Sequence, residues 1–139
     1  MKLIEGKIKI RVSYADTDQM GVVYYARYLE YFERGRNELF RELGLPYRKL
    51  EERGIMLPAI EAHCEYKRGA KYDEVIIVKT FLKEPQGAKI RMDYEILGEK
   101  DERVLIKGYT VHTFVNAKGK AIKPPKDFMK LISKEVKDG

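Results

Sequence analysis

Apolar and polar residues alternate along five stretches of the chain, which is the pattern of β-strands with one buried face. The five stretches are 7–12, 58–67, 74–83, 89–97 and 103–116. In the fourth stretch, Ile90, Met92 and Tyr94 fall on one face, while Lys89 and Arg91 fall on the other. Turn-forming residues separate the stretches, so several neighbouring pairs are close enough in sequence to form hairpins.

Two segments follow the helical period instead. The apolar positions of the longer one are Tyr28, Phe32, Gly35, Leu39 and Leu43. Their spacing of three or four predicts an amphipathic helix of about five turns, and Gly44 followed by Pro46 marks its C-terminal end. A short helical turn is predicted at 47–52. A second amphipathic helix is predicted after Pro125, with Phe128, Leu131 and Ile132 facing inward.

The order of these elements predicts an α+β protein with one antiparallel five-stranded sheet, one long helix and a short C-terminal helix. A chain of 139 residues fits one domain, which we expect to span 1–139. A single long helix covers only part of one sheet face, so the remaining apolar surface would have to be buried between subunits. We therefore expect at least a homodimer and favour a homotetramer.

Composition narrows the class of protein. Apolar residues make up 44% of the chain, with ten tyrosines and five phenylalanines, as in a packed globular protein. Cys64 is the only cysteine, which excludes an intramolecular disulfide, and its spacing from the two histidines matches no zinc site. We see neither a long apolar run nor the apolar segment of a secretory signal. These features predict a cytoplasmic protein without a bound metal or integral membrane association.

Charge and residue bias add two expectations. The net charge of +6 favours anionic partners, which include nucleic acid, a membrane surface or a phosphorylated small molecule. The basic residues are dispersed rather than clustered with aromatic residues, which argues against a nucleic-acid partner. Lys and Glu are abundant, whereas Gln and Asn occur twice each. That bias is typical of proteins that work at high temperature, so we expect a thermophilic source.

The loop 14–25, between the first strand and the long helix, carries the candidate chemistry. Asp16 and Asp18 bring two carboxylates to the helix entrance. The simplest role for a loop aspartate is to cap a turn through backbone hydrogen bonds. None of Tyr24, Tyr25 and Ala26 is a good N-cap residue, so the first N–H groups of the helix are predicted to lack a side-chain acceptor. Such groups, with the helix dipole, suit a developing oxyanion.

This loop and the following helix contain a composite motif. It reads Tyr14-x-Asp16-Thr17-Asp18-x-x-Gly21-Val22-Val23-Tyr24-Tyr25-Ala26-x-Tyr28-Leu29, then Phe32-Glu33-x-x-Arg36 and Gly44-Leu45-Pro46, with Pro58 and Tyr72-Asp73 further on. With these residues, most of the chain resembles the 4-hydroxybenzoyl-CoA thioesterase-like family of hotdog-fold acyl-CoA thioesterases. The resemblance implies a sheet wrapped around the central helix and hydrolysis of an acyl-CoA to a free acid and CoA.

The resemblance also implies which residues act. In the family the second aspartate of the motif carries the catalysis, which falls on Asp18, and the backbone N–H that polarises the thioester carbonyl falls on Tyr25. Asp18 would either attack the carbonyl to form a mixed anhydride or act as general base toward water, and the sequence leaves both open. One branch of the family has His and Asn where this chain has Tyr25 and Arg27, whereas Tyr25 is similar to the hydroxybenzoyl branch. No metal or redox cofactor is needed, because CoA is part of the substrate.

Further residues are candidates for substrate binding. They are Gly21, Val22, Tyr24, Tyr28, Glu61, Lys67, Arg68, Lys89 and Arg91. The glycine would let the substrate approach the backbone or would only form a turn. The valine belongs to the segment expected to supply backbone donors, and the tyrosines would line an acyl pocket or pack on the sheet. The glutamate would add a carboxylate near the cleft or face solvent, and the basic residues would meet the CoA phosphates.

Other chemically active side chains are predicted to be structural. His63 and His112 are expected to be satisfied surface or interface residues, and Cys64 a small apolar filler, because no nucleophile pattern surrounds them. A hydratase of the same fold is a rival enzyme, but within the fold that chemistry generally pairs a histidine with an acid, and the loop and long helix contain no histidine. A non-catalytic module that binds acyl-CoA or an acyl carrier is the other alternative.

Overall fold

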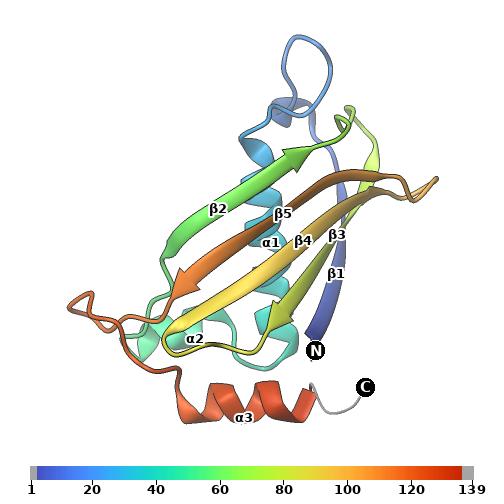
Figure 1. Cartoon of the computed structure of the whole chain (residues 1–139). Coiled ribbons are helices and arrows are strands. Elements are labelled where there is room, and N and C mark those ends of the chain that lie inside the picture. The colour runs from blue at the N-terminus through green and yellow to red at the C-terminus, as the bar shows by residue number, and fades with distance from the viewer. Residues whose placement is uncertain (1–2, 136–139) are drawn as a thin grey trace.

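The computed structural model describes residues 3–135, and its strands form one antiparallel sheet (Figure 1). The strands are β1 (Leu3–Arg11), β2 (Ala59–Tyr66), β3 (Val75–Lys83), β4 (Lys89–Gly98) and β5 (Val104–Thr113). The helices are α1 (Arg27–Glu42), α2 (Tyr47–Glu52) and α3 (Lys126–Glu135), and a short 3₁₀ turn, η1, spans Tyr14–Asp16. All five predicted strands and all three predicted helices are present, in the predicted order.

The strand order in the sheet is β1-β3-β4-β5-β2, so β1 and β2 are the two edges. The three central strands follow one another in sequence as hairpins, while β2 pairs with β5. The predicted start of β1 at residue 7 is wrong, because β1 pairs with β3 from Leu3 onward. The predicted end of the last strand at residue 116 is also too late. β5 ends at Thr113, and Val115 instead forms isolated bridges with Met56 and Ala121.

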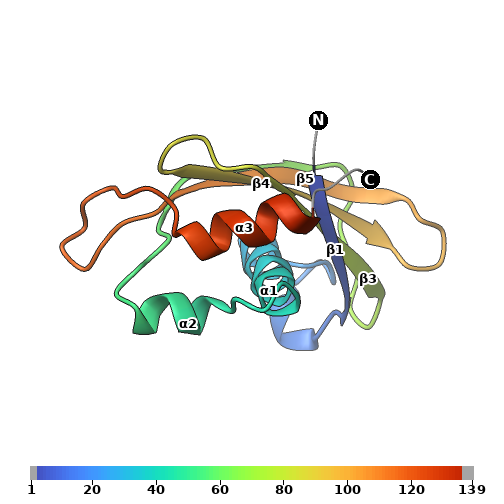
Figure 2. The ribbon, with the colours of Figure 1, turned by 90° about the horizontal axis from the view of Figure 1, so that it is seen from below.

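Helix α1 lies across one face of the sheet (Figure 2). Its buried side includes Tyr28, Phe32 and Leu39, and the Phe32 ring stacks on Tyr94 of β4 with centroids 4.2 Å apart. Gly35 permits this close packing, since a Cβ there would lie 2.6 Å from Thr80 Oγ1. The helix has 16 residues and is followed by Leu43 and by Gly44 with φ +86°. It is thus somewhat shorter than predicted, with the predicted C-terminal glycine.

Helix α3 packs at the C-terminal end of α1 (Figure 2). Phe128 is buried, with its ring 5.8 Å from Phe40 of α1 and 5.3 Å from Phe114. Ile132 is also buried, whereas Leu131 is only partly so. The inward-facing positions expected for this helix are therefore largely confirmed.

Strand β2 is the part of the sheet that the helices leave open. Every residue of β2 except Cys64 is exposed. The exposed fraction is 51% for Ile60 and 50% for Tyr66, which is high for large apolar side chains. The sheet therefore ends at one edge in a strand that packs against little in the single chain.

Candidate active site

Asp18 lies in a small hairpin between β1 and α1. Thr17 and Val23 form an antiparallel bridge, and the Asp18 N–H donates to Val22 O at 2.9 Å. The turn closes with the Gly21 N–H donating to Asp18 O at 3.0 Å. Gly21 has φ +79°, a left-handed conformation that favours glycine. The role of Gly21 in the turn is thus visible, and its predicted contact with substrate stays a prediction.

The two oxygens of the Asp18 carboxylate have different surroundings. Oδ1 accepts a hydrogen bond from the Met20 N–H at 2.8 Å, as in an Asx-turn. Within residues 3–135, no group donates to Oδ2, and the side chain is exposed. One oxygen therefore caps the turn, and the other is available to react.

Asp16 fixes the entrance to α1. Its backbone O accepts from the Tyr24 N–H at 2.9 Å, and its Oδ2 accepts from the Tyr31 hydroxyl at 2.9 Å. Arg27 Nε lies 3.7 Å from Oδ1. Burial, followed by the hydrogen bond to Asp16, raises the pKa of Tyr31. These contacts give Asp16 the structural role expected for it.

The turn that leads into α1 leaves two backbone amides open. The Arg27 N–H donates to Tyr24 O at 2.8 Å, and the Tyr28 N–H donates to Tyr25 O at 3.4 Å. The N–H groups of Tyr25 and Ala26 have no acceptor in the described part of the chain, and Ala26 caps the helix with no side-chain hydrogen bond. The expected lack of a side-chain cap is confirmed.

Tyrosines surround these amides. The Tyr25 ring is 4.7 Å from Tyr24 and 6.2 Å from Tyr66, measured between centroids. The Tyr66 hydroxyl donates to Tyr25 O at 3.4 Å, and burial is the main cause that raises its pKa to about 12. Sequence reasoning missed Tyr66 as a site residue. The alternation along the strand could have indicated it, because Tyr66 falls on the same face as Ala62 and Cys64.

Tyr28 is a core residue rather than a wall of the site. Its exposed fraction is 2%, and its hydroxyl accepts from the Ala70 N–H at 3.0 Å. Burial raises the pKa of Tyr28, and nearby negative groups, Asp18 among them, act in the same direction. Because Tyr28 is buried, the structure does not support its predicted direct contact with substrate. The residue lies beneath the site instead.

The segment that follows β2 runs beside the Asp18 hairpin. Val22 forms a bridge with Lys71, and the Val23 N–H donates to Ala70 O at 2.8 Å. A Cβ on Gly69 would lie 3.1 Å from the Val22 Cβ, so the two segments are in contact. This contact brings the adjacent Lys67 and Arg68 to the same end of the molecule as Asp18.

Glu61, Lys89 and Arg91 lie on the opposite face of the sheet. Glu61 Oε2 accepts from the Tyr109 hydroxyl at 2.6 Å, and the Arg91 guanidinium lies 3.9 Å above the centre of that ring. Their strand neighbours Met92 and Tyr94 are buried toward α1, so the alternation points Lys89 and Arg91 outward. The structure therefore does not bring these three side chains together with Asp18.

The two histidines and the cysteine are occupied by structural contacts. His63 stacks on Tyr109 on the outer face, with Nε2 3.1 Å from Glu65. Burial raises the pKa of Cys64, as expected of a filler. His112 was expected at the surface or an interface, which is wrong for the single chain. It is buried, because β5 points it inward beside Thr110.

Within residues 3–135, no cluster of three or more His, Cys, Asp or Glu side chains is arranged to hold a metal ion. No helix among these residues combines the length and apolar character needed to cross a membrane.

Comparison with known proteins identifies the family. Residues 12–132 match the model of the thioesterase-like superfamily. YneP of Bacillus subtilis is 36% identical over 110 residues, which is 79% of each chain. The acyl-CoA thioesterase YbgC of Haemophilus influenzae is 38% identical over 89 residues, covering 63% of this chain and 65% of that one. The DHNA-CoA thioesterase of Staphylococcus aureus is 29% identical, with a TM-score of 0.88, covering 94% of this chain and 89% of that one.

The matched region begins just before the Asp18 hairpin and extends into α3. The hotdog architecture expected from the motif is confirmed, with the antiparallel sheet packed on the central helix α1. The chain belongs to the thioesterase-like superfamily of hotdog-fold proteins.

Proposed function

We propose that this protein is an acyl-CoA thioesterase that releases a free acid and CoA, with Asp18 and the Tyr25 amide as its reacting groups. The observation that carries this proposal is an unpartnered Asp18 oxygen in the hairpin and open amides in the turn that directly follows it and leads into α1. The names of relatives, an acyl-CoA thioesterase and a DHNA-CoA thioesterase, support the substrate class.

Asp18 drives the reaction through its free Oδ2. In one route this oxygen attacks the thioester carbonyl, expels the CoA thiolate and leaves a mixed anhydride that water then hydrolyses. In the other it accepts a proton from a water molecule, which attacks the carbonyl and expels the same thiolate. Acyl label found on rapidly quenched protein would select the first route.

The Tyr25 N–H, together with that of Ala26, stabilises the negative charge that develops on the carbonyl oxygen. A preorganised backbone donor of this kind is worth a few kcal/mol in the transition state. The positive end of the helix dipole acts on the same oxygen. Tyr24 and Gly21 then border the bound thioester, with Val22 beside them.

The CoA portion meets basic side chains near the site. Lys67 and Arg68 are the best placed, because their segment runs along the Asp18 hairpin. Lys89 and Arg91 point to the outer face of the sheet. They would contact the CoA phosphates only if the CoA extended over that face. No cofactor beyond CoA takes part in this scheme.

The open β2 edge supports a homodimer. An exposed edge strand offers unpaired backbone groups to a second copy, and Ile60 and Tyr66 supply apolar surface beside it. Pairing of two such dimers would give the homotetramer that we favour. A cytoplasmic location and a thermophilic source complete the proposal. The ion pairs of Asp93 with Lys83 and Arg91 are consistent with a thermophilic source.

The decisive experiment compares the wild type with Asp18→Asn on a series of aliphatic and aromatic acyl-CoAs. The amide can still accept from Met20 but can neither attack nor take a proton, so kcat should fall about 10²- to 10⁴-fold. Asp73→Asn is the matched control, since asparagine tolerates the left-handed backbone of that loop position (φ 69°). Equal turnover in Asp18→Asn and the wild type would remove Asp18 from the mechanism.

Failure of the wild type to hydrolyse any thioester would favour the alternative, a non-catalytic module. Calorimetry with the same acyl-CoAs would then show binding without release of thiol. A hydratase is less compatible with the site, because both histidines are engaged elsewhere in the fold.

A further inference from the structure

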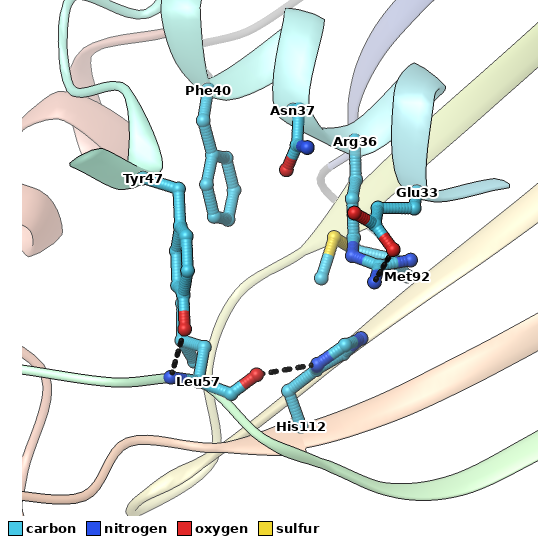
Figure 3. A pocket seen from close by; sticks show the side chains of 8 residues that line it. All are labelled: Glu33, Arg36, Asn37, Phe40, Tyr47, Leu57, Met92 and His112. Carbon is cyan, nitrogen blue, oxygen red and sulfur yellow. Dashed lines mark hydrogen bonds and ion pairs between the residues drawn. The ribbon is translucent and has the colours of Figure 1, made fainter. Parts of the chain in front are cut away.

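A cavity of about 220 Å³ lies between the middle of α1, the start of α2 and the sheet (Figure 3). Its walls mix apolar side chains, Phe40, Leu57 and Met92, with polar ones, and His112 lies below. Arg36 extends from α1 toward the cavity floor (Figure 3). None of the residues that the sequence motif implicates in catalysis lines this space.

Arg36 is a largely buried cation with few partners. The exposed fraction of its side chain is 18%. Nη1 donates to the Tyr94 hydroxyl at a long 3.4 Å, and Nη2 lies 4.0 Å from Glu33 Oε1. The Glu33 side chain is 60% exposed, so it compensates the charge only weakly. A guanidinium has five N–H donors, and most of these have no acceptor among the described residues.

A chain of buried hydrogen bonds holds Arg36 in place. His112 Nδ1 lies 2.9 Å from Leu57 O and must donate to it, because a carbonyl only accepts. Burial lowers the pKa of His112, so the ring is neutral and its Nε2 accepts from Thr110 Oγ1 at 2.9 Å. Thr110 then accepts from the Tyr94 hydroxyl at 2.7 Å, which leaves the Tyr94 oxygen to accept from Arg36. Every bond runs in one direction, away from the guanidinium.

The cavity and the proposed reaction centre share one face of α1. Residues four or three apart on a helix lie above one another, so Leu29, Glu33 and Arg36 form one stripe. Tyr25, in the turn that leads into α1, precedes this stripe at its N-terminal end. Leu29 is 40% exposed, which keeps the stripe open in the single chain. At about 1.5 Å per residue, Arg36 lies roughly 16 Å along the axis from Tyr25, and its long side chain shortens that span by several Å.

We propose that the acyl group runs along this stripe and that Arg36 binds a carboxylate at its far end. The preferred substrate is then a straight-chain acyl-CoA of about ten carbons with a terminal carboxylate, since each carbon adds about 1.3 Å to an extended chain. Leu29 on the stripe and Met92 beside Arg36 contact the methylene groups. The spare donors of the fixed guanidinium take the carboxylate, which compensates the buried charge more closely than the exposed Glu33 does. This inference rests on the proposed function.

The test compares decanedioyl mono-CoA with decanoyl-CoA. We expect a kcat/KM at least about tenfold higher for the carboxylated substrate in the wild type, and a fall of about ten- to hundredfold for that substrate in Arg36→Gln, mainly through KM. Arg34→Gln is the matched control, because Arg34 is exposed on the same helix. In Arg34→Gln, the ratio of kcat/KM for decanedioyl mono-CoA to that for decanoyl-CoA should equal the wild-type ratio. A wild-type preference for decanoyl-CoA, or an equal ratio in Arg36→Gln, would overturn the proposal.

Thr110 is a positioning residue in this scheme. Thr110→Val breaks the hydrogen-bond chain and should reduce the preference for the carboxylated substrate, and Thr110→Ser should restore it. A merely structural role would lower the melting temperature of Thr110→Val but leave that preference intact.

Direct binding separates this inference from the proposed function. Free decanedioate should bind the wild type more tightly than decanoate by calorimetry, and Arg36→Gln should lose the difference. If neither CoA ester is hydrolysed but decanedioate still binds through Arg36, the thioesterase proposal fails and the carboxylate site stands. Equal binding of the two free acids would refute the carboxylate site.

Discussion

His112 shows what burial does to a single titratable residue. The ring is 2% exposed, and both of its nitrogens are engaged, by Leu57 O and by Thr110. Loss of solvent lowers its pKa most strongly, the Leu57 carbonyl opposes that shift, and the Arg36 charge reinforces it. Histidine is common in active sites, but this neutral ring has a structural role, because both nitrogens are hydrogen-bonded within the core.

The stability of the protein should fall as the pH drops below about 6.5, because the unfolded chain then binds a proton at residue 112 that the folded state resists. The contribution of His112 is full above that pH and is lost as the pH falls through the lowered, folded-state value. Urea unfolding of the wild type and His112→Gln from pH 7.5 to 5 measures this. The variant should show a shallower pH dependence, whereas His63→Gln, at an exposed position, should follow the wild type more closely.

At the level of the element, the start of α1 is the unusual feature. A helix of 16 residues with a strongly buried face would normally begin at a side-chain cap, but here the chain turns at Tyr24 without one. The anchoring is done instead by Asp16, which holds the Tyr24 N–H and the Tyr31 hydroxyl. This arrangement stabilises the helix while leaving the Tyr25 and Ala26 amides for another acceptor.

Supplying the missing cap should therefore raise stability and lower activity. Two residues before the capping position Ala26, Tyr24 O already accepts the Arg27 N–H. A serine side chain at position 24 can therefore accept from the neighbouring amides, whereas an alanine cannot, and both remove the tyrosine ring. We expect Tyr24→Ser to be more stable than Tyr24→Ala by about 1 kcal/mol and to have the lower kcat of the two. Thermal unfolding and thioesterase assays of the pair measure both effects. Higher activity in the serine variant would contradict the role of these amides.

For the whole molecule, the sheet is asymmetric in its coverage. Helix α1 covers one face of the sheet, and α3 packs near the C-terminal end of α1 (Figures 1 and 2). Strand β2 lies at an edge of the sheet, and nearly all of its residues are exposed. The apolar residues exposed at this edge are close to the reaction centre, since Tyr66 contacts Tyr25. Assembly and catalysis are therefore expected to be linked.

Ile60→Lys should shift the protein from dimer or tetramer toward a monomer of 16.3 kDa, because it places a charge on the surface that the second copy would bury. Light scattering after size exclusion gives the mass, and the acyl-CoA assay shows whether activity falls with it. Tyr72→Lys changes an aromatic residue that is 55% exposed and lies outside β2, so it should leave the mass unchanged. A monomeric wild type at micromolar concentration would refute this edge as an interface.

Much of the fold follows from periodicity in the sequence. The alternation at Ile90, Met92 and Tyr94 correctly marks the face of β4 that meets α1, and the helical spacing of Phe32 and Leu39 marks the face of α1 that meets the sheet. The start of β1 was missed because Gly6 interrupts the apolar pattern, while its pairing with Thr80 of β3 is set by a strand far along the chain. Long-range pairing of this kind has no local signal.

The sequence by itself determined the elements, the face that each one buries, and the motif around Asp18 that indicates thioester chemistry. Only the tertiary structure decided which candidates meet. In the folded chain, Glu61 and Arg91 lie on the outer face of the sheet, and Tyr66 packs against Tyr25. Arg36 is connected to His112 by hydrogen bonds through Tyr94 and Thr110. The physical reason is that a period of 2 or 3.6 residues fixes the direction of a side chain within its own element. Which other element lies opposite depends on strand order and packing over the whole chain.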